Sequence, residues 1–572
     1  MDDIERIAAE EERLGSWPRR LLHIPSMTSF PWQPGNVYGN SKEPKYNILS
    51  YTWGRWRLKD DDEHANEVES VAIAGVPWNI PKVNPTHFTA DQFLEVMSSL
   101  TRPFSSDSSH PNVPGVDFIW VDVACIDQRR GQPEAAAEVG RQADIFRKAT
   151  RCFAWLASTE ESDLFRSLDN IQEALVDLRV PKAFLKEKRQ DCEIMDIILS
   201  ALRTILGDPW FSSLWTLQES FLCPHMKLLS REGRTAHWEY NSPRTSLQLL
   251  FTSILADLEP RLYRTDTDAE AAQKLRLILD LTTRFGLSTL STSNIIAPYI
   301  ASRNRTASRK EDTIYAIQQI FGFRLGSSAI GLGGRSFTLP QLQTQFANEL
   351  LSLYPAQSQT FLHTKPAPVG TAWLPSGDSR VPHGIPEYTR ASHTFTGACK
   401  EDTDAQPPCV LGVSDLNGTT WATFTGLACP WLDFQTIFTQ ADQEQLRKQF
   451  WLSVCLDAGN APSTVFNCLG KEVLTLPLGF LAEAQTVVLL LGHYETPSDD
   501  GWHVPQTAAV GLILKPNLEH GSQPHYRRLG FCVWRQKLRY PPALLPNNPD
   551  FLFSMERSAS PAGWKVVSGL IG

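Results

Sequence analysis

The stretch FIWVDVACIDQ, from Phe118 to Gln128, limits what this chain can fold into more than any other part of its sequence. Eight of its first nine residues are apolar, and β-branched or aromatic types dominate. Such a run is typical of a strand buried on both faces, as in a parallel sheet with helices above and below. Asp122 alone interrupts the run, and an unpaired buried carboxylate would cost several kcal/mol. We therefore predict a parallel α/β sheet in which Asp122 is held by hydrogen bonds.

Two polar residues, Asp127 and Gln128, follow where this strand is expected to emerge from the core. In open α/β sheets, ligands bind outside the carboxyl ends of the strands. A functional site is therefore expected first at this edge of the sheet, where Asp122, Asp127 and Gln128 would border it.

The segments around this stretch have the patterns of further strands and helices. In chain order they predict a helix over 2–14, strands over 20–24 and 46–51, a strand pair between 68 and 81 and a helix over 89–100. A helix over 134–151 then leads to a strand over 152–156, and this βαβ unit implies parallel pairing with a right-handed crossover. Later helices are predicted over 162–206, 210–222, 244–257, 268–285 and 310–322.

The character of the sequence changes after Gly331. Pro, Gly and Ser crowd residues 364–388, and short β-rich runs follow at 410–413, 419–424, 451–456, 473–476, 486–491, 508–514 and 529–534. A chain of 572 residues is also too long for one hydrophobic core. We divide it into a lead-in at 1–45, an α/β domain at 46–222, a helical extension at 223–330, a Pro/Gly-rich linker region at 331–404 and a mostly antiparallel β-rich domain at 405–572.

The charge and the hydropathy of the chain exclude several classes of partner. The net charge is −9, which gives no basic surface for nucleic acid. No apolar run approaches the roughly 20 residues of a membrane span, and the acidic N-terminus lacks the pattern of a signal peptide. We therefore expect an intracellular, cytoplasmic protein.

The ten cysteines are scattered, with no Cys-x-x-Cys pair and no short Cys/His spacing. In a reducing compartment, such cysteines are expected to be small core residues rather than disulfides or zinc ligands. Cys125, with no His near it in sequence, is interpreted as packing. No metal site is predicted.

Three motifs occur in a fixed order along the chain: Tyr46-x-x-Leu49-Ser50-Tyr51-x-Trp53-Gly54, Trp120-x-Asp122-x-x-Cys125-Ile126-Asp127-Gln128 and Trp210-Phe211-x-x-x-Trp215-x-x-Gln218-Glu219. Together they resemble the signature blocks of the fungal heterokaryon-incompatibility (HET) domain. A segment similar to one that often follows this domain is Lys310-x-Asp312-x-x-Tyr315-Ala316. The resemblance implies non-self recognition or programmed cell death, through self-association or contact with another incompatibility protein.

HET domains in turn resemble TIR domains, which are flavodoxin-like α/β modules that assemble and, in several branches, cleave NAD. The resemblance implies Glu219 as the catalytic carboxylate, because it can stabilise the oxocarbenium character that develops when the nicotinamide–ribose bond breaks. Asp122 or Asp127 would bind the ribose hydroxyls, and Trp53 or Trp215 would stack on the substrate. NAD would be a substrate, and no cofactor is predicted.

Other interpretations stand beside this one. Trp and Tyr in these motifs also serve as large buried anchors, Glu219 as a cap or ion-pair partner within a helix, and Asp122 as a structural hydrogen-bond acceptor. The chain also departs from the family pattern at Glu138, Gln142 and Ser213. These departures motivate a third hypothesis, a degenerate scaffold that retains only the fold, beside the self-associating effector and the NAD-cleaving hydrolase.

Overall fold

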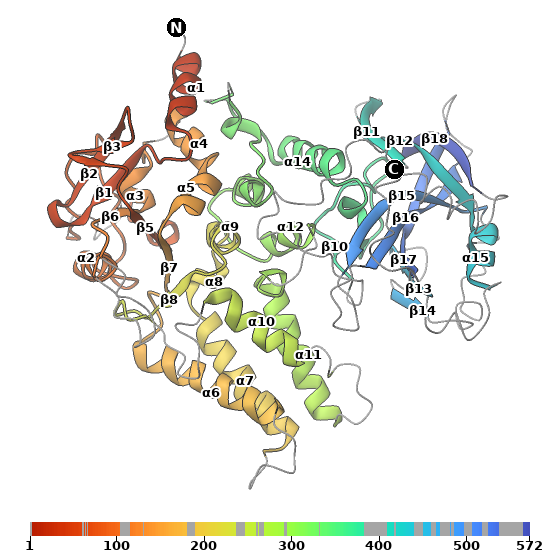
Figure 1. Ribbon diagram of the computed structural model, residues 1–572, viewed down its shortest axis with the longest axis horizontal. Helices are drawn as coiled ribbons and strands as arrows, with labels where there is room; N and C mark the ends of the chain where they lie inside the picture. The colour runs from red at the N-terminus through yellow and green to blue at the C-terminus, as the bar shows by residue number, and fades with distance from the viewer. Residues whose placement is uncertain are drawn as a thin grey trace, which may run out of the picture. The chain divides into compact units, whose positions relative to one another are not determined.

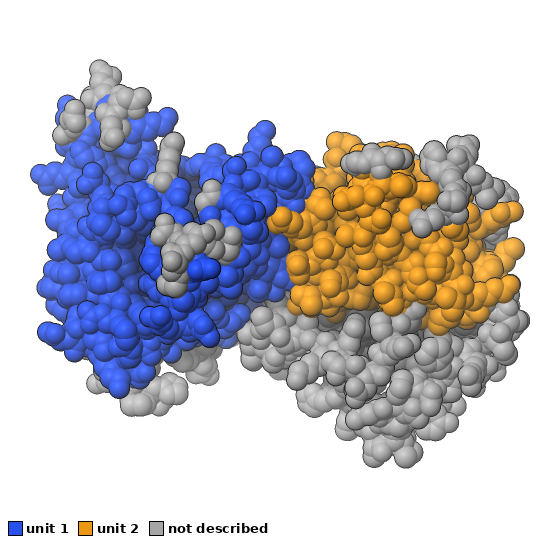
Figure 2. Space-filling view, turned by 90° about the horizontal axis from the view of Figure 1, so that it is seen from above, with its two compact units in different colours: residues 1–291, 301–342 blue, residues 292–300, 343–572 orange. Residues whose placement is uncertain are grey.

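The computed structural model divides into two compact units, residues 1–291 with 301–342 and residues 292–300 with 343–572 (Figures 1 and 2). Each unit is described by itself. The residues that the structure describes are 3–59, 62, 65, 67–102, 115–129, 131–179, 189–235, 246–258, 261, 268–290, 295–330, 332–333, 335–382, 409–416, 419–439, 450–458, 465–468, 481, 485–496, 506–517, 524–536 and 564–572.

An eight-stranded sheet forms the centre of the first unit, in the order β4-β3-β2-β1-β6-β5-β7-β8. Its strands are β1 (Arg20–His23), β2 (Thr28–Gln33), β3 (Val37–Tyr38), β4 (Ser41–Lys42), β5 (Tyr46–Ser50), β6 (Phe118–Trp120), β7 (Arg151–Trp155) and β8 (Lys227–Leu229). Strands β6, β5, β7 and β8 pair parallel to one another, and β1 joins β6 antiparallel. The predicted α/β class with a parallel sheet is therefore confirmed.

Helices surround this sheet and continue beyond it (Figure 1). They are α1 (Asp3–Leu14), α2 (Ala90–Ser99), α3 (Asp122–Cys125), α4 (Pro133–Val139), α5 (Gln142–Lys148), α6 (Glu161–Arg179), α7 (Asp191–Leu206), α8 (Pro209–Ser212), α9 (Trp215–Leu222), α10 (Leu247–Leu258), α11 (Ala269–Arg284) and α13 (Asp312–Tyr315). Helices α6, α7, α10 and α11 pack on one another. Across the described residues, no helix has both the length and the apolar character needed to span a bilayer.

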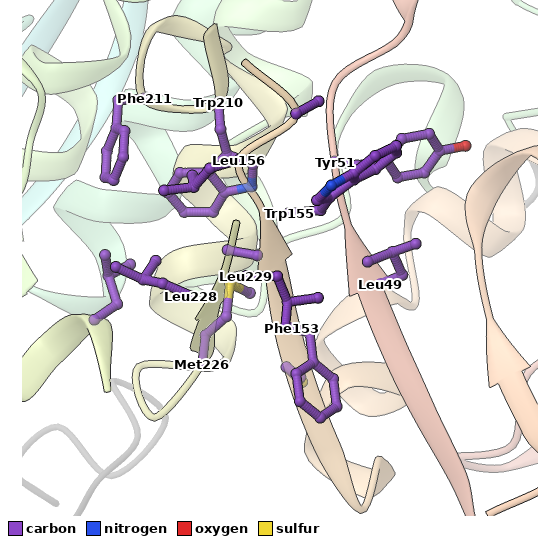
Figure 3. Close-up of a cluster of buried hydrophobic side chains, with 14 of the residues drawn as sticks. Leu49, Tyr51, Phe153, Trp155, Leu156, Trp210, Phe211, Met226, Leu228 and Leu229 are labelled. Carbon is purple, nitrogen blue, oxygen red and sulfur yellow. The ribbon is translucent and has the colours of Figure 1, made fainter. Parts of the chain in front are cut away.

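The central strands are buried on both faces, as their unbroken apolar sequences predict. Every residue of β5 and β6 is buried. In Figure 3, Trp155 and Tyr51 lie together to one side of Phe153 and Leu229, and Trp210 lies beside Leu156. Tyr51 and Trp155 have ring centroids 6.4 Å apart. The buried aromatic residues of the motifs are therefore core anchors, namely Tyr46, Tyr51, Trp120, Trp210 and Phe211, whereas Trp53 and Trp215 are partly exposed.

The stretch from Phe118 to Gln128 contains a shorter strand than predicted. Strand β6 ends at Trp120, and residues 122–125 form the single helical turn α3. An apolar run does not distinguish a buried strand from a buried helix, and here the helical turn follows at once. Asp122 is therefore not inside a strand. It is the first residue of α3, where a carboxylate is favoured by the free N–H groups of the helix end.

Other predicted elements are broken or absent. The predicted helix over 134–151 is two helices, α4 and α5, separated at Gly140 and Arg141, where a Cβ on Gly140 would lie 2.9 Å from the Ser328 carbonyl oxygen. The predicted helix over 210–222 is likewise split into α8 and α9. The predicted strand pair between 68 and 81 is wrong, because these residues contain only an isolated bridge, Thr28 to Ala74.

The expectation that the cysteines are unpaired core residues is wrong for Cys152 and Cys223, which form a disulfide. They lie 71 residues apart in the sequence, and only the fold brings β7 next to the end of α9. Among the described cysteines, Cys125, Cys409, Cys429, Cys455 and Cys532 are buried and free, as expected.

The second unit is built around a sheet with the strand order β11-β12-β15-β16-β17-β13-β14. Strand β18 pairs with both β12 and β17, so the path from β12 through β15, β16 and β17 closes into a barrel. The predicted antiparallel pairing is confirmed, apart from the parallel contact of β17 with β18. The strands and helices with bounds are β9 (Leu362–His363), β10 (Ser379–Arg380), β11 (Cys409–Leu416), β12 (Thr419–Pro430), β13 (Phe450–Leu456), β14 (Val465–Cys468), β15 (Val487–Thr496), β16 (Gln506–Asn517), β17 (His525–Gln536), β18 (Lys565–Ile571), α12 (Ala297–Ser302), α14 (Leu339–Leu353) and α15 (Trp431–Thr439).

Four of these strands, β9, β10, β14 and β18, have no counterpart among the predicted runs. The predicted strand over 473–476 lies outside the described residues, as does the part of the predicted linker region from 383 to 404.

A buried ion pair fixes the break between α4 and α5. Glu138 and Arg141 are each 1% exposed at the side chain, and their charged groups lie 3.1 Å apart. The other Glu138 oxygen accepts a hydrogen bond of 2.8 Å from the backbone N–H of Arg19. Arg141 also donates to the carbonyl oxygens of Gly15 and Trp17, each at 2.7 Å. The departure from the family pattern at Glu138 is therefore part of a structural contact that ties the N-terminal segment to the domain.

Replacing Glu138→Gln is expected to lower the free energy of unfolding by about 3 to 5 kcal/mol, because it leaves the buried guanidinium of Arg141 without its counter-charge. The matched control is Asp144→Asn, which breaks an i,i+3 pair of similar length, 3.0 Å, between side chains that are 46% and 40% exposed. That control should change the stability by less than about 0.5 kcal/mol. Urea unfolding of both variants checks this, and equal small losses would contradict it.

Candidate functional site

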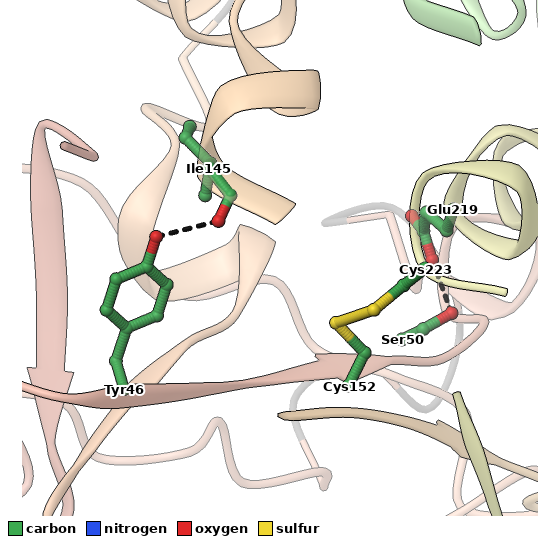
Figure 4. The surroundings of a disulfide bond; sticks show 6 residues. All are labelled: Tyr46, Ser50, Ile145, Cys152, Glu219 and Cys223. Carbon is green, nitrogen blue, oxygen red and sulfur yellow. Dashed lines mark hydrogen bonds between the residues drawn. A yellow bond between two sulfur atoms is a disulfide. The ribbon is translucent and has the colours of Figure 1, made fainter. Parts of the chain in front are cut away.

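The candidate site lies at the carboxyl end of β5, where Ser50 is the last strand residue. The hydroxyl of Ser50 donates a hydrogen bond to Glu219, which lies on α9 (Figure 4). The indole N–H of Trp210 donates to the same Ser50 oxygen at 2.8 Å. Trp210 and Ser50 are buried, whereas Glu219 keeps part of its surface exposed. A hydrogen-bonded chain therefore runs from the core to a carboxyl group that solvent can reach.

A second carboxyl group, Asp122, lies close to the first. One of its oxygens accepts a hydrogen bond of 2.6 Å from the indole N–H of Trp53, and the other accepts one of 2.7 Å from the backbone N–H of Val123. The buried hydroxyl of Tyr51 also acts on Asp122 and lowers the pKa of that carboxyl. Asp122 is therefore held by hydrogen bonds, as the sequence predicts, and like Glu219 it is only partly buried by surface area.

The pKa values of both carboxyl groups are raised. Burial raises the pKa of Glu219 from its ordinary value of 4.5 to about 8, and the charge of Asp122 adds to this, while Ser50 and the cation of Arg305 oppose it. Burial also raises the pKa of Asp122, against the hydrogen bond from Trp53 and the effect of the nearby Tyr51 hydroxyl. Close packing keeps water away from the two carboxyl groups, and this disfavours their ionised forms, although part of the surface of each residue stays exposed. Glu219 is therefore mainly protonated at neutral pH.

Arg305 is the described cation that acts on Glu219. It is buried, donates to the carbonyl oxygens of Ser213 and Phe285 at 3.0 and 3.1 Å, and reaches the Thr216 hydroxyl at 3.0 Å. Burial lowers the pKa of Arg305 to about 9, and Glu219 counteracts this. Because Arg305 is engaged by neutral groups of α9 and its surroundings, its charge offsets only part of the desolvation of Glu219.

The other residues predicted for this edge of the sheet, Asp127 and Gln128, are engaged by a cation and by backbone carbonyl groups. Burial alone would raise the pKa of Asp127, but hydrogen bonds from Arg129 outweigh it and hold the pKa below its usual range. Their charged groups are 2.6 Å apart. Gln128 donates to the carbonyl oxygens of Asp122 and Ile126, at 3.1 and 2.9 Å. Gln128 therefore positions the backbone that carries Asp122.

Trp215 contacts a third carboxyl group rather than the pair described above. Burial raises the pKa of Asp312 to about 6, and a hydrogen bond from Trp215 opposes this. Asp312 belongs to the segment that follows the three motifs in the sequence. This contact ties α9 to α13.

Two of the departures from the family pattern, Gln142 on α5 and Ser213 just before α9, take part in hydrogen bonds that hold α9. The amide of Gln218 donates to the side-chain oxygen of Gln142 at 2.6 Å and accepts from the backbone N–H of Gln319 at 3.1 Å. The backbone carbonyl of Ser213 accepts from Arg305. These contacts hold α9, the helix of Glu219, without involving its carboxyl group.

Sequence reasoning missed three groups that shape the site: Ser50, Trp210 and Arg305. Ser50 and Trp210 stand within the motifs but carry no catalytic signature, and Ser50 is 169 residues from Glu219. Arg305 lies outside the motifs altogether. A polar residue at the end of a buried parallel strand is the one signal that would have identified Ser50.

Within the described residues, Cys192, Asp268 and Glu270 form a group with the spacing of metal ligands. The ammonium of Lys274 lies 2.9 Å from Cys192 and 2.9 Å from Glu270, and it also contacts Asp196 at 2.6 Å. A lysine cation therefore already contacts two of these three groups, Cys192 and Glu270.

Replacing Glu219→Gln should stabilise the protein increasingly as the pH rises. The raised pKa means that the folded state favours the protonated carboxyl, so this contribution is full below about 4.5 and is lost as the pH rises through about 8. Glutamine keeps an oxygen that can accept from Ser50 and never ionises. The melting temperature of the variant relative to wild type should therefore increase between about pH 5 and pH 9.

The control is Glu173→Gln, at an exposed carboxyl on α6. It should show a melting-temperature difference that does not depend on pH. The same flat difference for Glu219→Gln would contradict the raised pKa.

Comparison with known proteins gives one match. The family model described as Heterokaryon incompatibility protein (HET) matches residues 46–219. None of the curated proteins and none of the solved structures matches the chain. The matched segment begins at the first residue of β5 and ends at Glu219, so it contains Ser50, Asp122 and Glu219. Residues 46–219 therefore carry a heterokaryon incompatibility (HET) domain.

Proposed function

We propose that this protein acts in heterokaryon incompatibility as an effector of programmed cell death, and that its HET domain cleaves the nicotinamide–ribose bond of NAD. The HET family match supports the incompatibility context. The observation that carries the enzymatic part is the partly exposed Glu219 carboxyl, which accepts a hydrogen bond from Ser50 at the end of the parallel strand β5. Burial raises the pKa of this carboxyl to about 8. Strongly shifted carboxyl groups in such positions are concentrated at functional sites.

The strand order supports a TIR-like, flavodoxin-like interpretation of the sheet. In order of appearance, the parallel strands β5, β6, β7 and β8 are arranged as 2-1-3-4, which is the order that begins a flavodoxin-like sheet. The connection direction reverses between β5 and β7, and ligands of such sheets bind at this switch point. Ser50 pairs with Ala154 of β7, so Ser50 and Glu219 lie at the switch point.

The chemistry needs a carboxylate next to the anomeric carbon. When the nicotinamide–ribose bond breaks, its electron pair neutralises the pyridinium nitrogen and positive charge develops on the ribose. The cationic pyridinium favours the ionised form of Glu219, so bound substrate would lower the pKa of this carboxyl. Ionised Glu219 then stabilises the oxocarbenium character and takes a proton from the water that adds to the ribose.

The neighbouring groups fit supporting roles. Asp122, held by Trp53 and Val123, offers acceptor capacity for ribose hydroxyls. Trp53 is partly exposed, so its ring can stack on a base while its N–H holds Asp122. Trp215 and Asp127, engaged by Asp312 and Arg129, are weaker candidates for substrate contact.

The kcat/KM for NAD cleavage should rise with pH through about 8, because the free enzyme becomes active as Glu219 ionises. Glu219→Gln should lower it by at least about 100-fold. Ser50→Ala removes a hydrogen bond that lowers the pKa of Glu219, so the profile should move to higher pH. Glu173→Gln should leave the profile unchanged, and a profile that Glu219→Gln also leaves intact would remove the proposed role of this residue.

Self-association is the second part of the proposal, and the sheet edges indicate where it would occur. The edge strand β4 has two residues, and β8 is bridged to Ser246 at its first residue and to Thr235 at its last. Short or covered edges offer little backbone for pairing between chains. Contacts between copies are therefore expected through helix surfaces of the HET domain.

Sedimentation of the full chain over a concentration series should show a larger species whose fraction rises with concentration. NAD cleavage per chain should rise over the same range if assembly completes the site. A single monomeric species with constant activity per chain would contradict self-association and leave the carboxyl chemistry standing.

A further inference from the structure

The Cys152–Cys223 disulfide borders a pocket of about 560 Å³ in the first unit. Both cysteines belong to its lining, together with the ends of α5 and α9 and the first residues of β7 and β8. Cys152 is 3% exposed, whereas Cys223 is partly exposed. The sulfur of Cys223 is therefore the one that an incoming molecule in the pocket reaches more readily.

The pocket lining carries positive charge. Arg147, Arg151 and Lys227 all line it, and no Asp or Glu is found among its described lining residues. Arg147 is paired with Asp144 at 3.0 Å, outside the lining. Positive surroundings attract anionic reactants and stabilise the thiolate that leaves when a disulfide is attacked.

The disulfide also fastens the helix that carries Glu219. The backbone N–H of Cys223 donates to the carbonyl oxygen of Glu219 at 2.9 Å and closes the last turn of α9. The covalent bond to Cys152 attaches this turn to β7, close to Ser50 and Glu219 (Figure 4). Opening the bond would leave the last turn of α9 held by that hydrogen bond and by packing.

We propose that the Cys152–Cys223 disulfide is a thiol–disulfide exchange site for small anionic thiols, entered through this pocket, and that its opening loosens the last turn of α9. A thiolate attacks Cys223 Sγ, a mixed disulfide forms, and Cys152 leaves as a thiolate that takes a proton from water. A second thiolate attacks the sulfur of the bound thiol, releasing the symmetrical disulfide and the thiolate of Cys223, which is also protonated. Two thiols supply the two electrons.

The experiment treats the full chain with three probes of different charge: glutathione, which is anionic, 2-mercaptoethanol, which is neutral, and cysteamine, which is cationic. Mass spectrometry of peptides measures adducts at Cys223 and free thiol at Cys152. At low salt, the rate constant per thiolate should be about 3- to 10-fold greater for glutathione than for cysteamine, and high salt should remove this preference because it screens the charges. The double variant Arg151→Gln, Lys227→Gln should reduce it as well.

Hydrogen exchange provides the readout of the helix and does not depend on the NAD-cleaving activity proposed above. Opening the bond should speed exchange in residues 215–222 by about tenfold or more, while α6 serves as the internal reference. The variant Cys152→Ser, Cys223→Ser should show fast exchange in α9 with or without thiol. Cys192→Ser controls for adducts at the partly exposed free cysteine.

Three results would overturn the proposal: no adduct at Cys223 with any probe, equal rates for the three probes at low salt, or unchanged exchange in α9 after the bond is open. Loss of NAD cleavage alone would test the function proposed above and not this site, because the adducts and the exchange rates are measured without substrate.

Discussion

The hydrogen bonds from Trp210 to Ser50 and from Ser50 to Glu219 connect the three parts on which the HET domain depends. Trp210 belongs to the buried core, Ser50 ends the central parallel strand, and Glu219 lies on the helix that follows. Because a parallel strand is covered on both faces, the polar group at its end must find a partner within the protein or in a site. Here that partner is a carboxyl group with an open edge.

The pKa of Glu219 is raised because few groups stabilise its ionised form against the effect of burial. Ser50 gives one hydrogen bond, and the cation that acts on Glu219, Arg305, is shared with backbone carbonyl groups. Asp122 adds a like charge close by. By contrast, the buried carboxylate of Glu138 has Arg141 at 3.1 Å and the backbone N–H of Arg19. Glu138 is thus paired with a cation at contact distance and Glu219 is not, although burial raises the pKa of both carboxyl groups.

Much of the fold was predictable because periodicity and unbroken apolar runs report burial directly. The parallel sheet, the held carboxylate at Asp122 and the antiparallel C-terminal sheet follow from local sequence. The end of β6 at Trp120, the break at Gly140 and the Cys152–Cys223 disulfide do not, because each depends on tertiary contacts. The close approach of Gly140 to Ser328, for example, joins residues far apart in sequence.

The site itself was predictable only in part. The resemblance to the HET family predicted Glu219, and the strand pattern predicted Asp122, and the structure brings these two carboxyl groups close together. The contact of Trp215 with Asp312 and the role of Ser50 depend on which way each side chain points, and a motif does not specify that. The raised pKa of Glu219 likewise could not be predicted from the sequence, because its largest cause is burial in the folded protein.

The most direct test of this account is the titration of the Glu219 carboxyl itself, followed by infrared difference spectra of wild type against Glu219→Gln across the pH range. The account predicts a protonated carboxyl band at neutral pH that disappears with a midpoint near 8 and is absent from the variant. A carboxylate that is already ionised at neutral pH, with a midpoint near the ordinary 4.5, would contradict it.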